Sequence, residues 1–127
     1  MLHPALYIAE SGEKGRGIFT SEDLDAGVLI ESSPVIVLPP EDRPLIDRTR
    51  LHDYIFEWGD NKEGCCMALG WIALYNHASP SNCEYEMDFE ADLIRVRTVR
   101  AVDAGEELSI NYNGDADNTE PVWFETI

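Results

Sequence analysis

The sequence predicts a single, mainly β domain built from several small antiparallel sheets with few short helices. Short apolar runs rich in Val, Ile, Tyr and Phe are separated by turns that contain glycine or proline. Residues 83–90 alternate without a miss between apolar and acidic side chains, which is the period of a half-buried strand. The 127 residues suffice for one domain with its own core and no disulfide.

The N-terminal half contains the first predicted strands. An apolar run at 5–9 is separated from Ile18 and Phe19 by a glycine-rich loop. Two further short strands are predicted at 28–31 and 35–38, and two prolines close the second.

A charged, proline-containing stretch at 41–50 predicts an irregular surface insertion. Residues 51–56 fit either a strand or a helical turn. Residues 65–77 are nearly continuously apolar, and their alanines, Gly70 and lack of alternation favour a buried short helix or coil over a strand.

The alternating segment 83–90 is the clearest strand of the chain. Residues 90–92 can turn it into a second strand at 94–99, so that acidic side chains face Arg95 and Arg97 across a hairpin. The sequence Asp-Ala-Gly occurs at 25–27 and again at 103–105, which predicts two similar corner turns.

Charge limits the class of partner. The chain has 9 Lys and Arg against 25 Asp and Glu, a net charge of −16, so it lacks the basic surface that a general nucleic-acid binder needs. Acidity favours a cationic partner instead.

The start has no signal-peptide pattern, and no segment approaches the ~18 apolar residues of a membrane span. We therefore expect an intracellular protein without direct nucleic-acid or membrane contact, cytoplasmic by default.

Neither a disulfide framework nor a metal site is expected. The three cysteines are odd in number, and two of them, Cys65 and Cys66, are adjacent in the sequence. No Cys-x-x-Cys pair occurs and the three histidines are far apart, so the spacing that zinc sites show is missing.

Three segments carry the residue types of a binding or catalytic site. They are Gly15-Arg16-Gly17, the polar run 75–82 and the turn and strand 105–112. Each has a structural interpretation when taken alone. The glycines suit a tight loop, the asparagines suit turns, and a tyrosine at a strand end is commonly a core residue.

The order of these segments resembles the SET-domain protein-lysine methyltransferases of the minimal stand-alone type, as in viruses and bacteria. The family's GxG, RFxNHSCxPN and GEELxxDY correspond to KGRGIF at 14–19, ALYNHASPSN at 73–82 and GEELSINY at 105–112. The resemblance covers about residues 5–124. It implies one domain over 1–127 with a core of about 5–114, a pseudoknot-like C-terminal arrangement and a short closing segment at 115–127.

The resemblance also implies a function: methyl transfer from S-adenosylmethionine to a lysine of a basic protein or peptide, such as a histone tail. Its catalytic residues would be Tyr112 and, in the lysine channel, Tyr54. Its cofactor-binding residues would be Lys14, Gly15, Arg16, Gly17, Tyr75, Asn76, His77, Tyr112, Trp123 and Phe124. A histone substrate would place the protein in a nucleus.

The chain also departs from the family pattern. Ala78-Ser79 stands where the family has Ser-Cys, and Asn111 precedes the tyrosine in place of Asp. The resemblance therefore implies no zinc-binding module after the domain.

The short closing segment motivates the hypothesis of a homodimer. A non-catalytic module that keeps this fold and binds a peptide or partner is the alternative. The intact Gly15-Arg16-Gly17, Asn76-His77 and Tyr112 favour catalysis.

Overall fold

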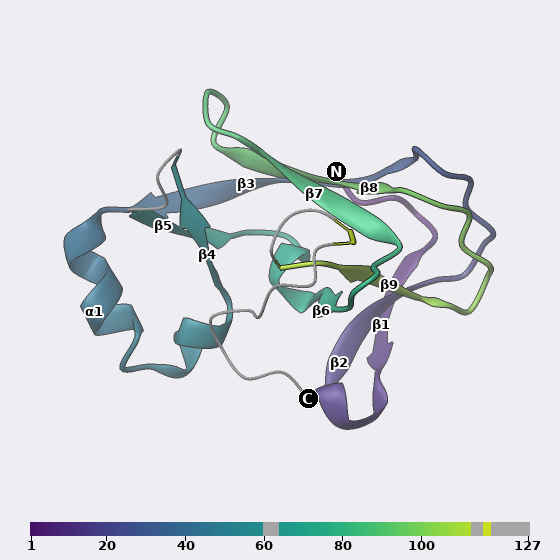
Figure 1. Cartoon of the computed structure of the whole chain (residues 1–127), viewed down its shortest axis with the longest axis horizontal. Helices are drawn as coiled ribbons and strands as arrows, with labels where there is room; N and C mark the ends of the chain where they lie inside the picture. Colours follow the sequence, from purple (N-terminus) through teal and green to yellow (C-terminus); the bar gives the residue numbers. More distant parts are fainter. Residues whose placement is uncertain (60–63, 113–115, 118–127) are drawn as a thin grey trace.

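The computed structural model describes residues 1–59, 64–112 and 116–117, and it contains two sheets (Figure 1). The first sheet has the strand order β1 (Leu6–Glu10), β2 (Arg16–Thr20), β9 (Glu107–Ile110) and β6 (Asn76–His77). The second has the order β4 (Ile55–Trp58), β5 (Gly64–Ala68), β3 (Leu29–Leu38), β8 (Leu93–Thr98) and β7 (Cys83–Asp88). The predicted mainly β class with small, mostly antiparallel sheets is confirmed.

The first predicted hairpin is present. β1 and β2 pair antiparallel from Leu6 opposite Thr20 to Glu10 opposite Arg16. The glycine-rich loop between them contains one 3-10 turn, η1 (Gly12–Lys14). Gly15 follows with a φ of 78°, a left-handed conformation that favours glycine.

The prediction of two separate strands at 28–31 and 35–38 is wrong, because β3 runs unbroken through Pro34. Its first part pairs with β8 as far as Pro34 opposite Leu93, and its second part pairs with β5 from Val35 opposite Ala68. Proline lacks the N–H of a strand residue. Pro34 stands where β3 changes partners, so the strand tolerates it.

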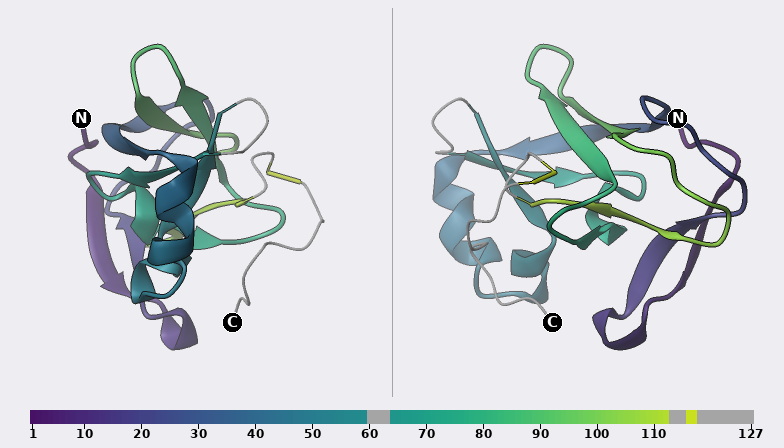
Figure 2. Two further views of the ribbon diagram at one scale, coloured as in Figure 1. Left: turned by 90° about the vertical axis from the view of Figure 1, so that its left-hand side faces the viewer. Right: turned by 45° about the vertical axis from the view of Figure 1, so that its right-hand side comes forward.

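The insertion predicted as irregular contains short helices. These are η2 (Pro40–Asp42), α1 (Arg43–Ile46) and η3 (Arg50–Asp53). Pro44 lies in the first turn of α1, a position where the missing N–H costs nothing. Of the two alternatives for 51–56, the structure takes the helical turn first and begins β4 at Ile55. Figures 1 and 2 place α1 at the end of the molecule opposite the β1–β2 hairpin.

The prediction of a helix or coil for 65–77 is partly wrong. Residues 64–68 form β5, and 3-10 structure is confined to η4 (Ile72–Leu74) before β6 begins. β5 pairs with both β3 and β4, and Cys65 and Cys66 are both fully buried. A strand buried on both faces shows no alternation, which explains why periodicity missed it.

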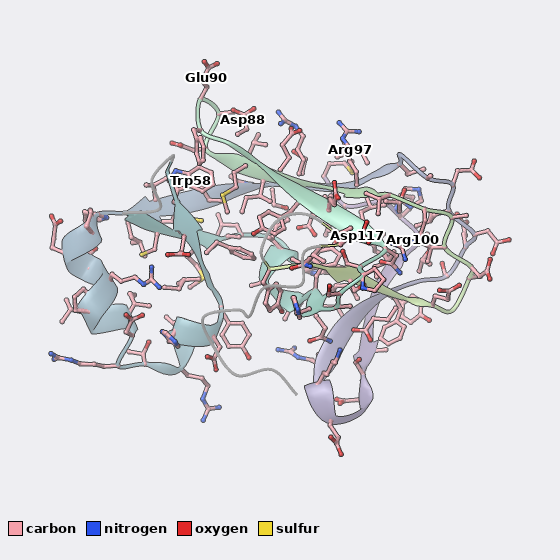
Figure 3. The ribbon with its side chains drawn as sticks, viewed as in Figure 1. Trp58, Asp88, Glu90, Arg97, Arg100 and Asp117 are labelled. Carbon is pink, nitrogen blue, oxygen red and sulfur yellow. The ribbon has the colours of Figure 1, made fainter. Side chains whose placement is uncertain are left out.

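The second hairpin forms as predicted. β7 and β8 pair from Cys83 opposite Thr98 to Asp88 opposite Leu93. Arg95 donates to Glu86 Oε1 at 2.8 Å and to Asp88 Oδ2 at 2.7 Å, so part of the acidic face is neutralised across the strands. Asp88 and Glu90 lie toward the tip of this hairpin (Figure 3).

The two Asp-Ala-Gly turns are also confirmed. Gly27 and Gly105 both have left-handed φ angles, 81° and 89°. Just before each turn, Leu24 and Val102 exchange two backbone hydrogen bonds of 2.8 and 2.9 Å. The segment that follows β2 is therefore hydrogen-bonded to the segment that follows β8, directly before each of the two turns.

The pseudoknot-like arrangement rests on the short strand β6. It runs parallel to β9, with Asn76 opposite Ser109 and His77 opposite Ile110. Both strands lie near the middle of the molecule in Figure 1. Beyond β9, Ala116 accepts a hydrogen bond from the backbone N–H of Ser81 at 3.0 Å. Segments some thirty residues apart are thus tied together on both sides of Tyr112.

The core lies between the sheets and is formed by buried apolar side chains. They include Ile18, Ile30, Ile72, Tyr75, Cys83, Ile94, Val96, Val102, Leu108 and Ile110. No helix within the described ranges is long and apolar enough to cross a membrane.

Neighbouring residues on β8 test how much this core stabilises the fold. Ile94 is fully buried, so Ile94→Ala should lower the free energy of unfolding by about 2–5 kcal/mol. Arg95 has only part-exposed ion pairs at the sheet surface, and Arg95→Ala should leave stability nearly unchanged. Urea unfolding followed by circular dichroism compares the two. Equal losses would show that the strand is not held by its buried face.

Candidate active site

The loop of Gly15 and Gly17 is built for close approach. Gly15 is exposed and has open space around the position of a Cβ atom. Gly17 is buried, and a Cβ there would lie 2.9 Å from Asn76 Nδ2 and closer still to Glu107 Oε2. Two later segments of the chain therefore press against this loop, and only glycine leaves them room.

Asn76 links the three segments that the sequence singled out. Its Nδ2 donates to the backbone oxygen of Arg16 at 3.2 Å and to Glu107 Oε2 at 2.7 Å. Glu107 also accepts from the Ser11 hydroxyl. Within the described residues the amide oxygen of Asn76 has no hydrogen-bond partner, which leaves an acceptor beside the glycine loop.

Lys14 reaches the same place from η1. Its Nζ donates to the backbone oxygen of His77 at 3.2 Å. Arg16 is exposed. The loop thus presents two positive side chains around Asn76 and His77 in a chain whose net charge is −16.

Tyr112 is held at three points. Its backbone N–H donates to His77 Nδ1 at 3.1 Å, its hydroxyl donates to the backbone oxygen of Tyr75 at 2.7 Å, and its own backbone oxygen accepts from the Tyr85 hydroxyl at 2.9 Å. The rings of His77 and Tyr112 lie 5.1 Å apart between centroids. These contacts fix the phenol in one orientation.

The site also fixes the protonation of both rings. Burial, with a smaller contribution from Lys14, lowers the pKa of His77. Because His77 Nδ1 accepts from Tyr112, the neutral ring carries its proton on Nε2. Burial, followed by the negative charge of Glu107, raises the pKa of the Tyr112 hydroxyl well above its usual range. Tyr112 is therefore a neutral phenol near pH 7.

The remaining predicted site residues have fewer contacts with Asn76, His77 and Tyr112. Tyr54 is 41% exposed and follows η3, and it makes one of the smaller electrostatic contributions that raise the pKa of Tyr112. Tyr75 is fully buried, so its backbone carbonyl and not its ring serves the site. Trp123 and Phe124 lie outside the described residues.

The sequence analysis missed the roles of three supporting residues. Glu107 and Tyr85 hold Asn76 and Tyr112, as described above. Asn82 was interpreted as a turn residue, but its side chain donates to the backbone oxygen of Glu107 at 2.8 Å and accepts from Ser109 N at 2.8 Å. Nothing in the local sequence pattern signals these contacts, because each partner lies 25 residues or more away.

The arrangement suits binding and orientation of a ligand by backbone and neutral groups. Tyr112 and the carbonyl of Tyr75 present oxygen atoms, and Asn76 presents a further acceptor. Among residues 1–59, 64–112 and 116–117, no group of three or more His, Cys, Asp or Glu side chains could hold a metal ion.

Comparison with known proteins identifies relatives of this chain. Residues 15–113 match the family model of the SET domain. A histone-lysine N-methyltransferase of Schizosaccharomyces pombe, described as specific for lysine 37 of H3, is 30% identical over 126 residues, which are 98% of this chain and 80% of that protein.

Solved structures share the fold. A proposed histone methyltransferase of Plasmodium falciparum superposes with a TM-score of 0.68 at 24% identity, over 87% of this chain and 95% of that one. Polycomb Repressive Complex 2 of Chaetomium thermophilum bound to S-adenosylmethionine gives a TM-score of 0.72 at 20% identity, over 87% of this chain and 15% of that one.

A methyl group added at Gly17 tests the packing of the site. Gly17→Ala should displace the side chains of Asn76 and Glu107, shift the Asn76 side-chain amide signal in a nitrogen–proton NMR spectrum and cost about 1–3 kcal/mol of stability. Gly12→Ala is the control for an added methyl group, because the Cβ position of Gly12 has open space around it. Its φ of 54° adds a backbone strain that Gly17 does not have, so the comparison rests on the Asn76 signal, which Gly12→Ala should leave unmoved. An unmoved Asn76 signal in Gly17→Ala would contradict the close approach.

Acidification should release Tyr112 from His77. The pKa of His77 lies below 6.5 in the folded protein, so the unfolded chain takes up the proton first and stability falls as pH drops below about 6.5. The backbone amide signal of Tyr112 should move with a midpoint below 6.5, because protonation removes the acceptor. Lys14→Met should raise that midpoint. A midpoint at or above 6.5 in the wild-type protein would disprove this environment.

Proposed function

The chain belongs to the SET-domain family, and from that premise we propose that it is a protein-lysine N-methyltransferase that uses S-adenosylmethionine. One observation carries the proposal. Three segments far apart in the sequence meet: the loop 14–17 is hydrogen-bonded to Asn76 and His77, and residues 75–77 in turn bind the hydroxyl and N–H of Tyr112. The relative from Schizosaccharomyces pombe, a histone-lysine methyltransferase, supports the same activity.

The described residues fit this cofactor by their chemistry. Lys14 and Arg16 offer positive charge for its carboxylate. The amide oxygen of Asn76, which has no hydrogen-bond partner in the described part of the chain, offers an acceptor for its amine. Gly15 leaves open space at the loop, where a larger ligand can approach backbone groups. Trp123 and Phe124 complete the proposed cofactor site by resemblance.

The bound cofactor supplies a methyl group on a positive sulfonium, and the protein supplies orientation. The acceptor is a lysine amine that must be neutral to attack, although its ordinary pKa is about 10.4. Desolvation favours the neutral amine. Tyr112 is held as a neutral phenol, so we assign it to orienting the amine in line rather than to removing its proton. Tyr54 is the proposed wall of the lysine channel.

The proposed substrate is a lysine in a basic protein or peptide, with a histone tail as one candidate. The net charge of −16 favours association with a cationic partner. A histone substrate would require a nuclear location. Three further points stay predictions. The chain forms one domain over 1–127, residues 115–127 close the site, and the protein forms a homodimer.

Calorimetry with S-adenosylmethionine tests the proposal, followed by mass spectrometry after addition of lysine-rich peptides. Binding and steps of +14 Da on lysine peptides, absent from matched peptides with Arg in place of Lys, would establish the activity. A failure to bind the cofactor would favour the alternative of a non-catalytic binding module.

Removing one oxygen atom tests Tyr112. Tyr112→Phe should leave the dissociation constant for S-adenosylmethionine within about twofold and lower turnover by roughly two or more orders of magnitude, because the lost group acts in the transition state. Tyr7→Phe is the control, since Tyr7 lies on β1 with its ring against Phe19. Unchanged turnover of Tyr112→Phe would remove Tyr112 from the mechanism.

A further inference from the structure

A buried carboxylate lies outside the proposed catalytic and cofactor-binding residues. Glu31 on β3 is 0% exposed. Its Oε2 accepts from the Ser33 hydroxyl at 2.6 Å and from the Trp71 backbone N–H at 2.8 Å, and its Oε1 accepts from the Tyr75 hydroxyl at 2.9 Å. Burial of a carboxylate is costly, and hydrogen bonds of this kind offset that cost.

Two of the three donors come from the two ends of one short turn, whereas Ser33 lies on β3 itself. Trp71 precedes η4 and Tyr75 follows it. Gly70 has a φ of 66°, and a Cβ there would lie 2.5 Å from Glu31 Oε2. The backbone of the turn is thus packed directly against the carboxylate, and Glu31 sets the position of both ends of η4.

This turn carries the group that holds Tyr112. The backbone oxygen of Tyr75 accepts from the Tyr112 hydroxyl at 2.7 Å, while the phenol of the same Tyr75 donates to Glu31. Tyr75 is fully buried. A displacement of its ring is therefore passed to its carbonyl and to the phenol of Tyr112.

We propose that Glu31 is a positioning residue for Tyr112, acting through the Tyr75 hydroxyl and carbonyl. The carboxylate suits this role because two oxygen atoms can accept from three donors at once. An apolar side chain would leave those donors unsatisfied, and an amide has one acceptor atom in place of two. The consequence for methyl transfer rests on the proposed function, whereas the structural coupling does not.

Two substitutions interrupt the coupling from opposite ends. Glu31→Gln keeps the size of the side chain but turns an NH₂ group toward one donor. Tyr75→Phe removes the hydroxyl and keeps the backbone carbonyl. With tyrosine labelled by ¹³C at the ring carbon that bears the hydroxyl, each variant should shift the Tyr112 signal.

The kinetic expectation is equally specific. Each variant should lower kcat by about tenfold or more, because small misplacements of an orienting group are costly. KM for the peptide and the dissociation constant for S-adenosylmethionine should change by less than about twofold. The double variant should resemble either single one, since both remove the same connection.

Thr98→Val is the matched control. Thr98 is also buried, and its hydroxyl donates to the Asp25 backbone oxygen at 2.6 Å and accepts from Val28 N at 2.9 Å. Its loss should lower the melting temperature without shifting the Tyr112 signal or kcat.

The outcomes separate the two proposals. A Glu31→Gln protein that melts earlier but keeps the Tyr112 signal and kcat of the wild type would overturn the positioning role. If Glu31→Gln does not fold, Tyr75→Phe decides on the same criteria. If the wild-type protein neither binds the cofactor nor methylates any peptide, the proposed function fails, and the NMR signal of Tyr112 still decides the coupling.

Discussion

The parallel contact between β6 and β9 is the constraint on which the site depends. It places Asn76 opposite Ser109 and His77 opposite Ile110, so the asparagine-histidine segment and the tyrosine that follows β9 become neighbours. A parallel pair cannot be joined by a tight turn. The intervening residues instead form the β7–β8 hairpin and the second corner turn. β2 pairs with the other edge of β9, and the glycine loop that precedes β2 completes the arrangement.

Two carboxylates support this arrangement. Glu107 accepts from Asn76 and Ser11 at the glycine loop, whereas Glu31 accepts from both ends of η4 in the core. Both oxygen atoms of each carboxylate are used. Carboxylates bound through both oxygen atoms specify one geometry of their donors in a way that apolar packing does not. Residues 75–77 connect both carboxylates to Tyr112, whose orientation matters more to the proposed chemistry than its acidity.

The acidic surface and the site are separate features. Arg95 neutralises Glu86 and Asp88 on the β7–β8 hairpin, whose tip projects away from β6 and β9 in Figure 3. The positive side chains of Lys14 and Arg16 gather instead at the glycine loop. A negatively charged body with a locally positive loop is consistent with a cationic substrate and a cofactor that carries a carboxylate.

The sequence by itself determined the mainly β class, the 83–98 hairpin, both corner turns and the three motifs, because alternation and glycine turns depend on local chemistry. It did not determine that β3 continues through Pro34 or that residues 64–68 are a strand, since both depend on which strands pair. The sequence also did not predict the supporting contacts of Glu31, Tyr85, Asn82 and Glu107. Each joins residues distant in sequence, and only the tertiary structure decides which buried donors and acceptors meet.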